Sequence, residues 1–318
     1  MTSVISYSPA YTIVPTYECF NRCSYCNFRV DPGKGSFLSL QDALDRLQKL
    51  DSNRIAEMLV LSGEVHPSSA DREKWFTKIH QICELSLSLG FLPHTNVGPL
   101  SWDEMNRLKQ VNVSMGLMLE QLSPKFLETV HKHAPSKQPE VRLRQLEWAG
   151  KLKIPFTTGI LLGIGETSND IAESLKAIAI IQQRWGHIQE VILQPHSLGT
   201  HQESNFPSFN PEHLPGIITQ ARKILPESIS IQIPPNLVPE SNFLLECLEA
   251  GATDLGGISP KDEVNPDYAH PTYESLDKIL QPAGWKLKPR LPVYSQYYSW
   301  LSPSLQKAVL KKEKALIN

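Results

Sequence analysis

Three cysteines stand close together near the start of the chain. Cys19, Cys23 and Cys26 fall within "YECFNRCSYCNFR" at the spacing C-x₃-C-x₂-C, and the 318-residue sequence contains five cysteines in all. Thiolates are strong ligands for zinc and for iron–sulfur clusters. The other residues of the segment are mostly polar or basic, which is typical of a loop and not of a core strand. The spacing therefore predicts a metal centre in a loop.

Three interpretations of these cysteines are open. As free thiols they would be small buried residues, because cysteine is among the most buried residue types. As zinc ligands they would need a second pair of ligands, and the nearest candidates, His131 and His133, lie far away in the sequence. As ligands of a [4Fe–4S] cluster they would leave one iron without a protein ligand, open to a substrate or cofactor. The last interpretation fits three thiolates in a polar loop best.

Composition and charge narrow the class of protein. The chain is 41% hydrophobic, and its 31 basic and 33 acidic residues give a formal net charge of −2. This near-neutral net charge lacks the excess of positive charge that is typical of proteins that bind nucleic acid or anionic membranes. No apolar run approaches the roughly 18–20 residues that span a bilayer, and the first residues lack the features of a signal peptide. Five cysteines, three of them crowded, do not resemble a disulfide framework, so we expect a cytoplasmic protein.

Short β-rich runs alternate with longer helical patterns along the chain. The runs cover residues 11–18, 57–64, 92–98, 111–120, 155–166, 189–196, 228–235 and 252–259. Eight such runs predict parallel βα units that close into a (β/α)₈ TIM-type barrel, with an open doubly wound sheet as the alternative. The alternation fades near residue 280. We therefore expect a barrel over residues 1–280 and a C-terminal extension over 281–318 that caps it.

In such a barrel the active site lies at the carboxyl ends of the strands. The cysteines follow the first predicted strand, so they belong to that end. Glu120 and Asp254 are carboxylates predicted to lie there, and either is a candidate for proton transfer. Cys83 and Cys247 fall on apolar faces of predicted helices and are expected in the core.

The cysteine spacing, with an aromatic residue at Tyr25, resembles the signature C-x₃-C-x-Φ-C of radical S-adenosylmethionine (SAM) enzymes. The resemblance implies a full or partial barrel and a [4Fe–4S] cluster held by Cys19, Cys23 and Cys26. It also implies that SAM binds the open iron through its amine and carboxylate. A reducing electron donor would then drive cleavage of SAM to methionine and a 5′-deoxyadenosyl radical.

Further motifs of that family match other positions. Ser62-Gly63-Glu64 resembles a GGE-type motif whose carboxylate holds the SAM amino group, with serine in place of the first glycine. The run from Gly159 to Glu166 resembles G-x-I-x-G-x-x-E, which packs near adenine. Arg142, with Arg144 as the alternative, would face the SAM carboxylate. The cofactor-binding residues implied by the resemblance are Tyr25, Glu64, Ser114, Arg142, Gly159, Gly163 and Glu166.

Longer blocks, over about residues 10–275, resemble the CofG-type subunit of 7,8-didemethyl-8-hydroxy-5-deazariboflavin (FO) synthase. The resemblance implies an ammonia-releasing lyase of coenzyme F420 biosynthesis. It would cyclise 5-amino-5-(4-hydroxybenzyl)-6-(D-ribitylimino)-5,6-dihydrouracil, a tyrosine–diaminouracil adduct supplied by a CofH-type partner enzyme. Neutral groups expected to bind this adduct are Thr95, Asn96, Ser114, Thr157, Thr158 and Ser259.

Other functions stay open at this point. The segment "QPHSLGTHQE" is less basic than the resemblance leads us to expect, so Gln194 and His196 receive no role. A sibling radical SAM enzyme of CofH, menaquinone-pathway or biotin-synthase type would share the cysteine motif. An iron–sulfur electron carrier, a cluster scaffold or a zinc-stabilised scaffold would not be an enzyme.

Overall fold

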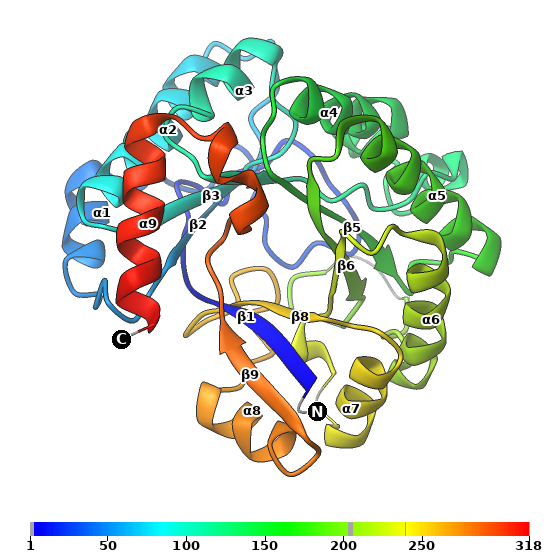
Figure 1. Ribbon diagram of the computed structural model, residues 1–318. Coiled ribbons are helices and arrows are strands. Elements are labelled where there is room, and N and C mark those ends of the chain that lie inside the picture. Colours follow the sequence, from blue (N-terminus) through cyan, green and yellow to red (C-terminus); the bar gives the residue numbers. More distant parts are fainter. Residues whose placement is uncertain (1–2, 203–205, 239, 318) are drawn as a thin grey trace.

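In the computed structural model, parallel strands alternate with helices around a central barrel (Figure 1). The structure describes residues 3–202, 206–238 and 240–317. The strands are β1 Ser3–Ile13, β2 Glu57–Leu61, β3 Leu92–Asn96, β4 Ser114–Gly116, β5 Phe156–Leu162, β6 Ile188–Pro195, β7 Ser230–Gln232, β8 Asp254–Ile258 and β9 Trp285–Pro289. The helices are α1 Leu40–Leu47, α2 Arg72–Ser88, α3 Trp102–Leu108, α4 Pro139–Lys151, α5 Ser168–Trp185, α6 Leu214–Ile224, α7 Ser241–Glu249, α8 Tyr273–Leu280 and α9 Pro303–Ile317.

Strand β1 closes the barrel. Strands β2 to β8 pair in sequence order, and β1 pairs in parallel with both β2 and β8. The predicted TIM-type barrel is therefore confirmed, and the open doubly wound sheet is wrong. None of the described helices has the length and apolar character needed to cross a membrane.

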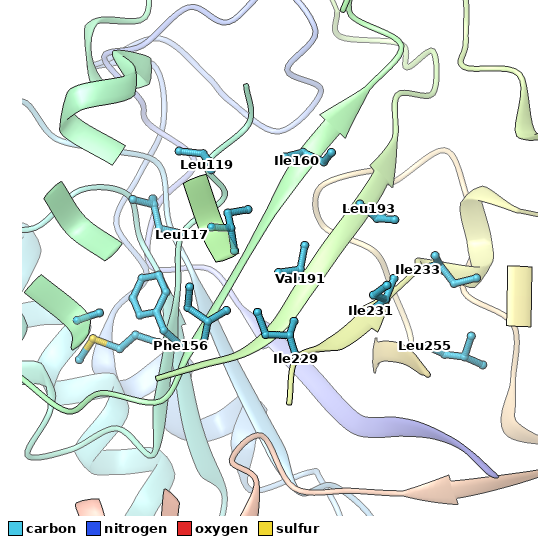
Figure 2. Close-up of a cluster of buried hydrophobic side chains, with 14 of the residues drawn as sticks. Leu117, Leu119, Phe156, Ile160, Val191, Leu193, Ile229, Ile231, Ile233 and Leu255 are labelled. Atoms are coloured by element: carbon cyan, nitrogen blue, oxygen red, sulfur yellow. The ribbon is translucent and has the colours of Figure 1, made fainter. Parts of the chain in front are cut away.

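Side chains alternate between the two faces of the barrel wall, as they must along a strand. On β6, Val191 and Leu193 join the hydrophobic core that includes residues of α5 and α6. Figure 2 shows them together with Ile231 and Ile233 from the neighbouring strand β7 and its continuation. The alternate residues of β6, Glu190, Ile192 and Gln194, line the barrel interior instead. The alternation thus gives an aliphatic outer layer and a partly polar interior.

Strand β1 begins eight residues earlier than the predicted run of 11–18. Its first half pairs with β9, from Ser3 opposite Trp285 to Tyr7 opposite Pro289. The sequence pattern predicted no strand in this C-terminal region. The serines in the first half of β1 weaken its apolar alternation, so the partner strand and not the local pattern decides where β1 begins.

The segment after β9 closes the amino end of the barrel. The guanidinium group of Arg290 donates two hydrogen bonds to the Asp254 carboxylate, at 2.6 and 2.8 Å, and also pairs with Glu190. The carbonyl of Pro292 accepts hydrogen bonds from Ser114 Oγ at 2.6 Å and from Gln189 Nε2 at 2.9 Å. Helix α9 packs against residues next to the starts of the strands. The division into residues 1–280 and 281–318 stays a prediction.

Two predicted positions at the mouth are wrong. Asp254 is the first residue of β8 and Ser114 is the first residue of β4, so both lie at the amino end of the barrel. Both side chains are fully buried and bind the segment after β9. The predicted runs 252–259 and 111–120 each contain a strand, but a run does not say at which end its polar residue lies.

Candidate functional site

The three cysteines lie in the loop between β1 and α1, at the carboxyl end of the barrel. The Cys19 N–H donates to the Val30 carbonyl at 3.1 Å, and the Cys26 N–H donates to the Cys23 carbonyl at 3.0 Å. All three thiols are free, and they line one cavity of about 320 Å³. The structure therefore brings the predicted metal ligands together at the predicted end of the barrel.

The chemistry of this cavity fits an iron–sulfur cluster. Burial raises the pKa of the Cys19 thiol to about 11 and that of the Cys23 thiol to about 12. A bound metal centre would displace these protons, because the thiolate is the ligand. In the described part of the chain, no three His, Cys, Asp or Glu side chains are grouped as ligands of a single metal ion. Three free thiols around one cavity form the soft, all-sulfur donor set that such clusters take.

Glu64 faces the cysteines from the end of β2. Its carboxylate accepts a hydrogen bond from Asn21 Nδ2 at 2.9 Å and pairs with Arg142 Nη2 at 3.4 Å. A Cβ atom on Gly98 would lie 2.3 Å from the Glu64 Cγ atom, so glycine leaves the space that this side chain occupies. Glu64 is thus held in a fixed position on the wall of the cavity.

Arg142 is a buried anchor on helix α4, with an exposed fraction of 2%. Its Nε donates to the Ser136 carbonyl and its Nη1 to the Met118 carbonyl, both at 3.0 Å. The alternative candidate, Arg144, lies over the ring of Trp148 and lines a different cavity. The geometry therefore favours Arg142 at the cysteine site, where it positions Glu64.

Glu120 and Lys137 form a buried ion pair on the same cavity. Burial opposes both charges, yet Lys137 and Arg142 lower the pKa of Glu120, and Glu120 raises the pKa of Lys137. Both groups are therefore charged at neutral pH. Glu120 adopts a positive φ of 66°, which is rare for a residue other than glycine. Sequence reasoning missed Lys137, which lies in the short 3₁₀ turn Pro135–Lys137.

The chain passes very close to itself at Gly63. A Cβ atom there would lie 2.1 Å from the Glu18 carbonyl oxygen, so the cysteine loop can rest on β2 only with glycine at this position. Ser62, which stands where the related motif has glycine, accepts a hydrogen bond from Trp75 Nε1 at 3.0 Å. Its hydroxyl therefore has a structural partner.

Of the remaining residues predicted to bind the cofactor, some line the cysteine cavity and others do not. Tyr25 lines the cavity, and its hydroxyl is hydrogen-bonded to His131 Nε2 at 3.0 Å, which gives that histidine a partner other than metal. Gly159 allows close strand pairing, because a Cβ there would lie 2.4 Å from the Ile192 carbonyl oxygen. The Glu166 carboxylate accepts the backbone N–H groups of Gly163 and Ile164 at 2.6 and 2.9 Å. Glu166 thus stabilises the turn after β5 and is not among the residues that line the cavity.

A second cavity, of about 160 Å³, fills the barrel interior. It adjoins the cysteine cavity, because several residues line both, among them Leu61, Leu117, Met118 and Gln194. Of the neutral groups expected to bind the adduct, Asn96, Thr157 and Ser259 line the interior, whereas Thr95 and Thr158 do not. A molecule inside the barrel could therefore reach from the amino end to the cysteine loop.

The comparisons with known proteins agree with this geometry. The family model described as "Radical SAM superfamily" matches residues 13–178, which include the cysteine loop and more than half of the chain. The chain belongs to the radical SAM superfamily. Membership of this superfamily implies a [4Fe–4S] cluster and SAM as cofactors, in agreement with the cluster interpretation of the cysteine loop.

Similar proteins narrow the family further. A protein of Trichormus variabilis (strain ATCC 29413 / PCC 7937) is 64% identical over 314 residues, covering 99% of this chain and 92% of its own. One of Nostoc sp. (strain PCC 7120 / SAG 25.82 / UTEX 2576) is 62% identical, covering 99% and 93%. Both are named 7,8-didemethyl-8-hydroxy-5-deazariboflavin synthase, and the radical SAM chain described here is a member of that synthase family.

Solved structures show the same fold at much lower identity. The hydrogenase maturase HydG of Carboxydothermus hydrogenoformans superposes with a TM-score of 0.76 at 17% identity, covering 98% of this chain and 77% of that one. Methylornithine synthase superposes with a TM-score of 0.69 at 15% identity, covering 94% and 86%. These likenesses support the barrel architecture alone.

Proposed function

We propose that this radical SAM protein cyclises the tyrosine–diaminouracil adduct to FO, releasing ammonia, methionine and 5′-deoxyadenosine. The observation that carries the proposal is a cysteine cavity that opens directly into the barrel interior, in a chain 64% identical to a named FO synthase over nearly its whole length. The adduct would come from a CofH-type partner enzyme, and a reducing protein would supply the electron.

In this proposal Cys19, Cys23 and Cys26 hold the [4Fe–4S] cluster. When bound, the cluster and SAM supply the radical that removes a hydrogen atom from the adduct. Glu64 accepts a hydrogen bond from the SAM amino group, which its fixed position on the cavity wall favours.

The neighbouring groups prepare the site for these ligands. Arg142 orients Glu64, while the Lys137–Glu120 pair places a charged donor and acceptor beside the cysteines without adding net charge. Tyr25 and Leu161 give the cavity an apolar wall of the kind that a flat adenine requires. The loops after β6 and β8 meet beside the cysteine loop, where the Thr200 N–H group and Asn27 Nδ2 each donate to the Asp267 carboxylate at 2.9 Å, and they help to exclude water.

The test is an anaerobic assay of the reconstituted protein with dithionite, SAM and the adduct. We expect deazaflavin fluorescence and 5′-deoxyadenosine together, both abolished by Cys23→Ala. Cys247→Ala is the matched control, because Cys247 is a buried cysteine of α7 outside both cavities. 5′-Deoxyadenosine without deazaflavin would assign a different substrate. Neither product from a protein with an intact cluster would refute the enzymatic proposal.

A further inference from the structure

The floor of the barrel cavity, at its amino end, presents polar side-chain atoms that have no hydrogen-bond partner among the described residues. Glu57, the first residue of β2, lines the cavity with an exposed fraction of 7%, and no described residue donates a hydrogen bond to its carboxylate. A carboxylate on a cavity wall that no protein group pairs needs hydrogen-bond donors from water or from a ligand in the cavity. Glu57 therefore indicates a ligand that brings hydrogen-bond donors.

His94, on β3, presents a second free acceptor to the same floor. The Ser114 hydroxyl donates to the Pro292 carbonyl, so it accepts from the Nδ1–H group of His94 at 2.7 Å. Burial lowers the pKa of His94, which leaves the ring neutral and its Nε2 atom as an acceptor. A Cβ atom on Gly116 would lie 2.8 Å from Nε2, so this atom faces the interior over a glycine.

Acidic side chains outnumber basic ones at the floor, so the floor does not favour an anionic ligand. Arg290 is the one Lys or Arg among the described residues that line this cavity, and it is already paired with Asp254 and Glu190. Burial raises the pKa of Glu190 to about 7. The nearby Asp254 carboxylate adds to this increase in the pKa, and Arg290 opposes it. A phosphate group would meet this excess of negative charge, whereas neutral hydroxyl groups would not.

We propose that this floor binds the ribityl chain of the substrate, with Glu57 and His94 Nε2 accepting hydrogen bonds from its hydroxyl groups. The inference rests on the proposed function. Leu61 is four residue steps along β2 from Glu57, which places the floor about 13 Å along the strand from the boundary with the cysteine cavity. The ring portions of the substrate then lie toward Leu117 and Met118, next to SAM, and the substrate is unphosphorylated.

The test compares the full adduct with an analogue that carries a methyl group in place of the ribityl chain. KM or an inhibition constant is measured from 5′-deoxyadenosine formation. For the wild type we expect at least 10-fold weaker binding of the analogue, because several hydrogen bonds to charged or buried acceptors are lost. Glu57→Gln should weaken the full adduct about 10-fold and leave the analogue unchanged.

Two further variants keep the test decisive. His94→Asn retains a donor to Ser114 but removes the Nε2 acceptor, so it should show the same selective loss. Glu104→Gln replaces a glutamate with an exposed fraction of 8% outside both the barrel cavity and the cysteine cavity, and should leave the ratio of the two constants unchanged. Cluster absorbance and melting temperature show that each variant is folded and loaded.

The outcomes separate this inference from the proposed function. If the wild type makes deazaflavin but binds the adduct and the methyl analogue equally well, the inference alone is overturned. The same holds if Glu57→Gln and His94→Asn weaken the binding of both compounds equally. A wild type that makes no deazaflavin from the full adduct would instead overturn the proposed function.

Discussion

Replacing Arg290 by methionine should destabilise the barrel strongly. The guanidinium group is the charged partner of Asp254, which has no exposed surface, and of the buried Glu190. Methionine keeps most of the side-chain volume but leaves two carboxylates without a cation. Breaking a buried ion pair in this way costs about 3–5 kcal/mol, about a fifth or more of the free energy of unfolding of a typical domain. The measurement is a urea titration followed by tryptophan fluorescence at pH 7.5.

Two controls define what this result means. Arg184→Met removes an arginine whose side chain is 56% exposed from its pair with Glu147, and it should cost less than about 1 kcal/mol. Adding Asp254→Asn to Arg290→Met removes one of the uncompensated charges and should recover part of the loss. The loss should also shrink at pH 5.5, because burial raises the pKa of Glu190 and, without the arginine, this carboxyl group takes up a proton. A loss below 1 kcal/mol for Arg290→Met would show that this ion pair does not hold the C-terminal segment in the barrel.

Three further predictions address other parts of the molecule. Gly63→Ala should prevent formation of a stable iron–sulfur site, measured as iron per chain, because the added Cβ atom would clash with the Glu18 carbonyl. The control Gly216→Ala places its Cβ atom in open space on α6 and should leave the iron content unchanged. Glu64→Gln should weaken SAM binding about 10-fold in equilibrium dialysis, with retained iron content. His187, whose pKa burial lowers from 6.5 to about 3, stabilises the fold fully above pH 6.5 and progressively less as the pH falls. The buried neutral His187 should lower the free energy of unfolding by about 2 kcal/mol at pH 5 relative to pH 7. In urea titrations, His187→Leu should remove this decrease.

The sequence predicted the central strands and the cysteine site well. Strands β2, β3 and β5 lie within the predicted runs, and β6 begins one residue before its run. In β2, β5 and β6 the signal comes from buried aliphatic residues of the hydrophobic core. The cysteines and Glu64 could be placed because the motif and the end of a strand coincide there. Both signals are local in the chain.

The floor of the barrel could not be predicted in the same way. Asp254 and Ser114 were assigned to the wrong end because a β-rich run does not show where within it the strand begins. Arg290 lies beyond the region of alternation, and its partners are 36 and 100 residues away in the sequence. Lys137 lies in a short turn with no periodicity. These contacts join residues that are far apart in the sequence, so a local sequence pattern cannot predict them.

The pairing of β9 with the first half of β1 has a consequence for how the protein is made. Residues 3–7 leave the ribosome about 280 residues ahead of their partners at 285–289. The early strand can pair with β2 along its second half, but its other contacts wait until β8 and β9 have been synthesised. A nascent chain therefore keeps an open barrel with exposed strand edges until these strands are made. We expect such chains to depend on chaperones, and those that stop short of Arg290 to be recognised as unfinished and degraded.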